Sequence, residues 1–194
     1  MKFLSLFVLS LLIFLSGCQD VQNLFEDPAG KITEDDALAQ NYNMTTPYYG
    51  IQVAISDNVE ASNERIMDLL DSRIKDFLDC QFFEGSDIGF SDYKLSNGVT
   101  VPPLSELKIY IVRKTFECNA VDKNICGGIY FSDTDTMVVA ERSIGRCEDL
   151  PLAKHETAHR YGLNTNHSNQ DSFSFCSNPK SCGFDDFLDL GIGG

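Results

Sequence analysis

The sequence has 194 residues, and its 29 aspartates and glutamates outnumber its 15 lysines and arginines, which gives a net charge of −14 at pH 7. This length is sufficient for one domain with its own hydrophobic core. The charge argues against a nucleic-acid-binding protein, because such a protein needs a basic surface to neutralise phosphates.

The first twenty residues have the pattern of an export signal that ends in a lipid attachment site. Lys2 precedes an apolar run over residues 3–15, which is shorter than the roughly 20 residues of a membrane-spanning helix. The run leads into LSGC, ending at Cys18, and this stretch resembles the lipobox of bacterial lipoproteins. The resemblance implies that residues 1–17 are removed and that Cys18 carries the lipid. It also implies an extracytoplasmic protein anchored to a membrane, and Gln19 favours the outer membrane of a diderm bacterium. An ordinary signal peptide, or an uncleaved anchor, with an incidental cysteine is the alternative.

Residues 18–49 are polar, and we expect them to form a tether between the lipid and a folded domain over residues 50–194. A single turn of helix is predicted within residues 33–40. A short inhibitory segment is the alternative function for this stretch.

The predicted domain alternates strands and helices. Apolar positions at three- and four-residue spacing predict a helix with one buried face over about residues 60–79. The stretch 81–103 is predicted as loop with a short strand near Tyr93, and residues 133–135 as a turn. Short runs rich in apolar and β-branched residues predict strands at 50–56, 107–116, 127–132 and 136–141. The fold class predicted from this order is α+β.

A second helix is expected to follow the last strand. Asp149 can cap its start, Pro151 is tolerated in a first turn, and Gly162 lies where a left-handed residue commonly ends a helix.

Besides Cys18, the chain has six cysteines, and an even number in an exported protein predicts three disulfides. The sequence does not determine the pairing, but Cys118–Cys126 and Cys176–Cys182 are the obvious local pairs. Ligation of zinc by Cys176 and Cys182 is the alternative, although the chain has no CxxC spacing. The six cysteines are Cys80, Cys118, Cys126, Cys147, Cys176 and Cys182.

The three histidines of the chain, His155, His159 and His167, all lie within the stretch KHETAHRYGLNTNHS. On a helix, His155 and His159 stack one turn apart on the same face, which is half of a tetrahedral zinc site. Glu156 can take a proton from a zinc-bound water and pass it to a leaving amine. This pattern is the HExxH motif of zinc peptidases.

The motif extends to HExxHxxG at Gly162 and so resembles the metzincin clan of zinc peptidases. The resemblance implies a mixed twisted sheet with a backing helix, an active-site helix and a small C-terminal subdomain. It also implies that the strand at 136–141 is the edge strand that pairs with extended substrate. The clan's third histidine would fall at Thr165, whereas His167 stands two residues later, and no methionine follows Met137 to form the clan's methionine turn. Alternative third ligands are Asp171, Asp185, Asp186 and Asp189.

The leading functional hypothesis is therefore a lipid-anchored zinc endopeptidase. His155, His159 and His167 bind one catalytic Zn²⁺, Glu156 is the general base, and peptides or proteins are the substrates. Tyr161 either orients substrate and steadies the oxyanion or, as is more common for such a tyrosine, packs against the sheet. Two alternatives stay open: a surface lipoprotein that keeps this scaffold to bind a partner without turnover, and a disulfide-stapled domain without metal.

Overall fold

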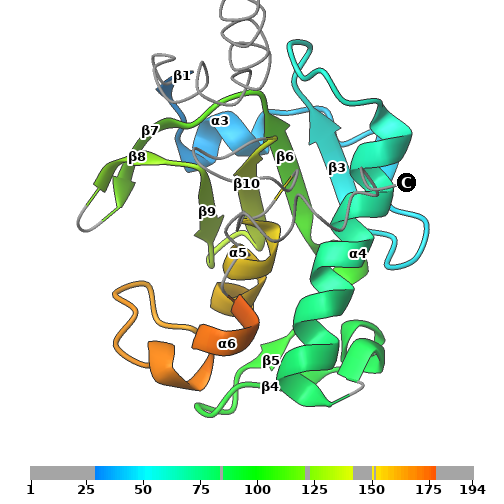
Figure 1. Cartoon of the computed structure of the whole chain (residues 1–194), viewed down its shortest axis with the longest axis vertical. Helices are drawn as coiled ribbons and strands as arrows, with labels where there is room; N and C mark the ends of the chain where they lie inside the picture. Colours follow the sequence, from blue (N-terminus) through cyan, green and yellow to red (C-terminus); the bar gives the residue numbers. More distant parts are fainter. Residues whose placement is uncertain (1–28, 84, 121–122, 142–149, 151, 178–194) are drawn as a thin grey trace, which may run out of the picture.

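The structure, a computed structural model, describes residues 29–83, 85–120, 123–141, 150 and 152–177. Its central element is a five-stranded mixed sheet, in which three parallel strands are flanked by an antiparallel strand at each edge (Figure 1). The strand order across the sheet is β2 (Met44–Thr45), β3 (Gln52–Ile55), β6 (Lys108–Val112), β10 (Thr136–Ala140) and β9 (Gly128–Phe131). The predicted α+β class and the strands at 50–56, 127–132 and 136–141 are confirmed.

The edge of this sheet next to β10 is formed by β9, so the expectation that residues 136–141 form the edge strand is wrong. After the turn at residues 132–135, the chain reverses and β10 inserts between β9 and β6, with Met137 opposite both Tyr130 and Ile109. All five residues of β10 are buried. A strand that is buried on both faces reads as a continuous apolar run, which is why TMVVA does not alternate.

Helix α4 (Asn63–Phe82) covers one face of the sheet and confirms the predicted helix (Figure 1). It begins later than expected because Ser62 caps it, with its side chain accepting a hydrogen bond from the backbone N–H of Arg65 at 3.3 Å. It ends at Phe83, which has a left-handed conformation. The residues that α4 buries are Ile66, Met67, Leu70, Asp71, Ile74, Phe77 and Leu78.

The predicted strand at 107–116 is two strands in different sheets. β6 ends at Val112, and β7 (Phe116–Ala120) joins a second sheet with β1 (Ala29–Lys31) and β8 (Lys123–Cys126), which was not predicted. At the start of β6, Lys108 N donates a hydrogen bond to the backbone oxygen of Asp135 at 3.1 Å, next to the first residue of β10.

Two disulfides join the described cysteines. The predicted Cys118–Cys126 pair is confirmed and links β7 to β8. The predicted Cys176–Cys182 pair is wrong, because Cys176 is bonded to Cys80 on α4. Cys147 and Cys182 lie outside the described residues. Disulfides of this kind are typical of extracytoplasmic proteins.

The stretch 29–49 has more regular structure than expected. The predicted turn of helix is α3 (Glu34–Leu38), which begins with a capping box between Thr33 and Asp36. Ala37 of α3 is buried against the sheet face opposite α4, together with Val138 and Ala140 of β10. Strands β1 and β2 were not predicted. Cys18 and the rest of residues 1–28 lie outside the described residues.

The loop predicted at 81–103 contains the short strand expected near Tyr93. Here β4 (Tyr93–Lys94) pairs with β5 (Thr100–Val101). The same stretch holds the 3₁₀ helix η1 (Gly85–Phe90), and η2 (Leu104–Glu106) follows it. Within the described ranges, no helix has the length and apolar character needed to cross a membrane.

Helix α5 (Ala153–Arg160) is the predicted histidine-bearing helix. Its N-cap is Leu152, which makes no side-chain capping bond, while Asp149 and Pro151 lie outside the described residues. Gly162 has a φ of 111°, so the prediction that it ends the helix with a left-handed residue is confirmed. Beyond it, the described chain forms only η3 (Gln170–Ser172) and α6 (Ser174–Ser177).

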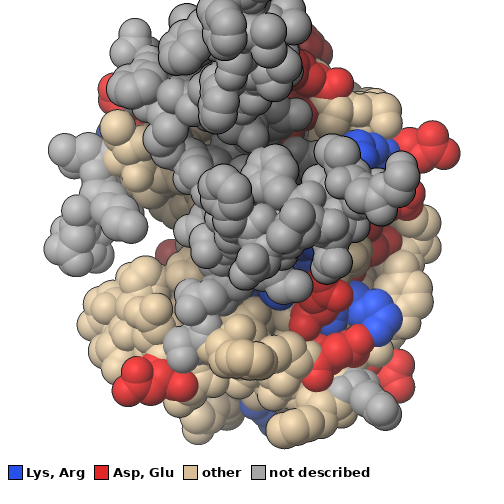
Figure 2. Space-filling model, in the orientation of Figure 1, with Lys and Arg blue, Asp and Glu red and all other residues tan. Residues whose placement is uncertain are grey.

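Figure 2 shows the charges on one face of the molecule. Acidic side chains are visible at several separate places, and some of those at the right of the view lie beside lysine or arginine. The distribution on this face agrees with the excess of 29 acidic over 15 basic residues in the sequence.

Candidate metal centre

The three histidines of the chain converge on one point. The Nε2 atoms of His155 and His167 are 3.2 Å apart, those of His159 and His155 are 3.3 Å apart, and those of His167 and His159 are 3.2 Å apart. The three atoms therefore form a nearly equilateral triangle. Among the described residues, this is the group of histidine, cysteine and acidic side chains that could hold a metal ion.

The size of the triangle fits a tetrahedral metal ion. With Zn–N distances of about 2.0–2.1 Å and tetrahedral angles, two ligand nitrogens must stand about 3.3–3.4 Å apart. The observed separations of 3.2–3.3 Å meet this requirement within about 0.2 Å, the tolerance used for such sites. Zinc is the metal that three imidazoles most commonly hold in this geometry, with the fourth position left to water or substrate.

His159 is oriented by the chain that follows its own helix. Its Nδ1 lies 2.9 Å from the carbonyl oxygen of Leu163. Because a carbonyl can only accept, Nδ1 carries the proton and Nε2 keeps its lone pair for a metal. Burial lowers the pKa of His159, while the Leu163 contact opposes this. The net lowering of the pKa favours the neutral imidazole, which is the form that ligates a metal.

His167 stands on a loop whose shape is fixed by side-chain amides. Asn169 Nδ2 donates to the carbonyl oxygen of Gly162 at 2.8 Å, and Asn169 Oδ1 accepts from the backbone N–H of Asn164 at 2.8 Å. His167 closes a turn by donating its N–H to the Asn164 carbonyl at 2.8 Å. The two residues inserted relative to the expected spacing are accommodated by this turn, in which His167 has a left-handed φ of 56°.

Glu156 lies next to the triangle on α5 and is 4% exposed. Its side chain packs on β9, where an ideal Cβ on Gly128 would stand 2.5 Å from Glu156 Oε1. Burial raises the pKa of Glu156 to about 8. A nearby cation has the opposite effect and favours the carboxylate.

Tyr161 belongs to the core and not to the histidine triangle. It is 3% exposed, and its ring lies 5.7 Å from that of Phe82 and 5.5 Å from that of Tyr93. Its hydroxyl accepts a hydrogen bond from Arg160 Nη1 at 3.4 Å. This position fits the packing alternative, and a side chain so placed has no exposed hydroxyl to offer to substrate.

Arg160 is a buried ion-pair partner rather than a solvated cation at the helix end. Its Nε and Nη2 bind the two carboxylate oxygens of Asp135 at 2.8 and 2.7 Å. Nη2 also donates to the carbonyl oxygens of Pro102 and Pro103 at 2.8 and 3.3 Å. These contacts fix α5 to the β9–β10 turn and hence fix the histidines relative to the sheet edge.

The remaining alternative ligands do not join the triangle in the described part of the chain. Asp171 is exposed and lies outside the cluster, and the acidic residues beyond 177 lie outside the described residues. Sequence reasoning missed Leu163, Asn169 and Gly128, all of which act through contacts. The asparagines of NTNHSN were a usable signal, since asparagine commonly builds turns.

Comparison with known protein families, with curated proteins and with solved structures finds no match to this chain. The functional conclusion therefore depends on the residues themselves.

Proposed function

We propose that this protein is a zinc-dependent endopeptidase with an extracytoplasmic location and a lipid anchor on Cys18. The observation that carries the proposal is the triangle of Nε2 atoms, 3.2–3.3 Å on a side, with Glu156 adjacent to its first ligand. Three imidazoles with an open fourth position are typical of catalytic zinc, whereas structural zinc sites are closed by four protein ligands.

His155, His159 and His167 would hold the metal. Bound zinc supplies Lewis acidity, which polarises a carbonyl and lowers the pKa of water to about 7. The carboxylate of Glu156 receives a proton from the attacking water and delivers it to the leaving amine. His167 is exposed, so a metal held by the three histidines would be accessible from solvent.

The neighbourhood of the site supports a peptide as substrate. Among the strands that the structure describes, β9 pairs only with β10, and it packs against α5. The free side of an edge strand offers backbone N–H and C=O groups to an extended chain. The HExxHxxG pattern adds the resemblance to metzincins, and the first 18 residues are the basis for the anchor.

A second candidate is a metal-binding surface lipoprotein without turnover. It is favoured by the burial of Glu156, because a carboxylate that is 4% exposed has little contact with the water it would have to deprotonate. Both candidates bind a metal through the same three histidines, and they differ in whether Glu156 acts as a general base.

The test uses the purified protein with its disulfides formed. Elemental analysis should find one zinc per chain, and a mixed peptide library should be cleaved by the wild type but not by Glu156→Gln, which keeps the metal. Stoichiometric zinc without cleavage by either form would favour the binding lipoprotein. No zinc in the wild type would reject both.

A further inference from the structure

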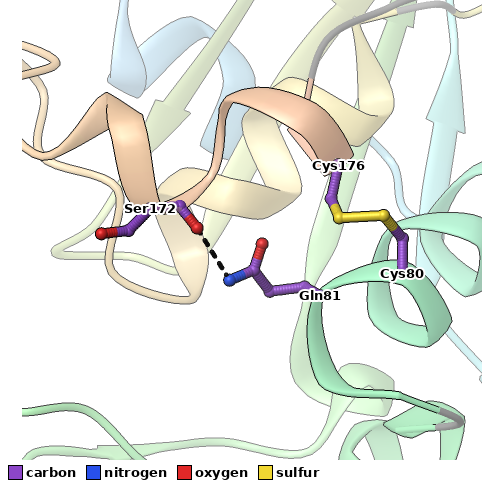
Figure 3. Close-up of a disulfide and its surroundings, with 4 residues drawn as sticks. All are labelled: Cys80, Gln81, Ser172 and Cys176. Atoms are coloured by element: carbon purple, nitrogen blue, oxygen red, sulfur yellow. Dashed lines mark hydrogen bonds between the residues drawn. A yellow bond between two sulfur atoms is a disulfide. The ribbon is translucent and has the colours of Figure 1, made fainter.

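The segment that carries the third histidine is attached to the molecule at a second place, on helix α4. Cys80, near the end of α4, forms a disulfide with Cys176 in α6, across 96 residues of sequence. At the next position, Gln81 Nε2 donates a hydrogen bond to the backbone oxygen of Ser172 at 3.0 Å. Figure 3 shows both contacts leaving the end of the same helix.

Helix α4, which makes these contacts, is held in place by the hydrophobic core. Its apolar face includes Leu70, Ile74 and Phe77, which have no exposed surface and belong to the main core. The contacts made by Cys80 and Gln81 therefore tie the segment after α5 to a part of the molecule that cannot shift without unpacking the core.

Backbone hydrogen bonds continue from this attachment to His167. Cys176 N donates to Phe173 O at 3.0 Å, Phe173 N to Gln170 O at 2.9 Å, and Gln170 N to His167 O at 3.0 Å. Successive turns thus transmit the position of Cys176 to the third ligand.

His167 needs this support in addition to the hydrogen bonds of Asn169, because its own side chain is not held by the core. It is exposed and adopts a left-handed φ of 56°, a region that a residue with a Cβ enters at a cost. His155 and His159, by contrast, are half-buried on α5. The third corner of the triangle is the one that most depends on what holds its loop.

We propose that the Cys80–Cys176 disulfide, together with Gln81, positions His167 for metal binding, so that the oxidised chain binds the metal more tightly than the chain without this disulfide. Forming the bond removes two electrons and two protons from the two thiols, and a disulfide oxidant accepts them by thiol–disulfide exchange. The inference rests on the metal-binding part of the proposed function and not on peptide hydrolysis. Cys80, Cys176 and Gln81 are positioning residues.

The experiment compares two double variants that each lose one disulfide. Zinc affinity, measured by competition with a chromophoric chelator, should fall roughly 10- to 100-fold in Cys80→Ser/Cys176→Ser, the range for lost outer-shell support. It should be unchanged in Cys118→Ser/Cys126→Ser, which removes the β7–β8 disulfide. Circular dichroism verifies that both are folded, and Gln81→Leu provides a milder variant with its disulfide intact and a smaller loss.

A third comparison distinguishes the positioning of His167 by the disulfide from a general loss of rigidity in the protein. In a His167→Ala background, removing Cys80–Cys176 should cause no further loss of zinc affinity, because the ligand that it positions is gone. Equal zinc affinity of the two double variants, or an undiminished loss in the His167→Ala background, would overturn the inference while leaving a peptidase intact. Zinc binding without cleavage would reject the peptidase and leave the inference, and no zinc in the wild type would reject both.

Discussion

Glu156 of α5 occupies the space in which a side chain on Gly128 of β9 would stand. An ideal Cβ at Gly128 would lie 2.5 Å from Oε1, 2.9 Å from Cγ and 3.0 Å from Cδ of Glu156. The helix that carries the histidines and the edge strand of the sheet approach this closely because one of the two residues has no side chain. The absence of a side chain at Gly128 thereby leaves room for the carboxyl group of Glu156 against β9.

Gly128→Ala should destabilise the protein by about 1–3 kcal/mol, the usual cost of forcing a methyl group into a packed site. The reason is that the carboxyl group cannot be displaced cheaply from a buried position. Urea denaturation, read as the change in midpoint at a constant slope, measures this loss.

Gly30→Ala is the matched control, since no atom lies within 4 Å of the Cβ that it would add. We expect a change of about 0.5 kcal/mol or less. Combining Gly128→Ala with Glu156→Ala should recover much of the loss, because the smaller side chain leaves room. Additive effects of the two substitutions would show that the crowding is not between these residues.

Arg160→Leu should cost about 3–5 kcal/mol, as expected when one partner of a buried ion pair is removed. The change removes both hydrogen bonds from the guanidinium to the Asp135 carboxylate, whose Oδ1 still accepts a hydrogen bond from the Tyr130 hydroxyl at 2.9 Å. It also removes the donor to the Pro102 and Pro103 carbonyl oxygens. Thermal unfolding followed by circular dichroism measures the effect.

Arg160→Lys tests the geometry of this pair, because lysine keeps the charge but cannot form the two parallel bonds to Asp135. Its loss should fall between those of the wild type and Arg160→Leu. The surface cation Lys75, which pairs with Asp79 on α4, is the control, and Lys75→Leu should change little. A similar effect at Lys75 and Arg160 would contradict the role given to burial.

The sequence was sufficient to predict that His155, His159 and His167 belong to one candidate site, but not how the third of them is held in place. His155 and His159 follow from helix periodicity alone, since residues four apart share a face. The loop of His167 is held by the amide of Asn169, and in our proposal also by the disulfide between Cys80 and Cys176, which are 96 residues apart, and no local pattern encodes either. The role of Gly128 could not be predicted from the sequence either, because it depends on Glu156 of α5, which packs against it.

The errors in the fold have the same origin. Strand β10 was mistaken for the edge strand because strand order depends on pairing between distant segments. The run 107–116 was read as one strand, although it turns into a second sheet at residues 113–115. Helix α4 was predicted well because its periodicity is local, although its start was placed too early because the cap at Ser62 was not recognised.

Zinc should raise the melting temperature of the protein. A ligand that binds only the folded state at 100 times its dissociation constant adds about 2.7 kcal/mol. For a chain of this size, this corresponds to an increase of roughly 5–11 °C. The increase should disappear in His155→Ala and persist in Asp171→Ala, whose exposed carboxylate lies outside the triangle. Thermal scans with zinc and with a chelator provide the comparison.

Asn169→Ala should weaken zinc binding without a large loss of stability. The side chain makes two hydrogen bonds that hold the loop between Gly162 and His167, and alanine removes both. Asn169→Asp keeps the acceptor for Asn164 N but loses the donor to the Gly162 carbonyl oxygen, so its effect should be intermediate. Asn43→Ala is the control, because Asn43 is exposed and lies next to β2, at the edge of the sheet opposite β9. Chelator competition gives the affinities. The zinc dissociation constant should increase from the wild type to Asn169→Asp and further to Asn169→Ala. Equal affinity of all three would mean that the loop holds His167 in place without this amide.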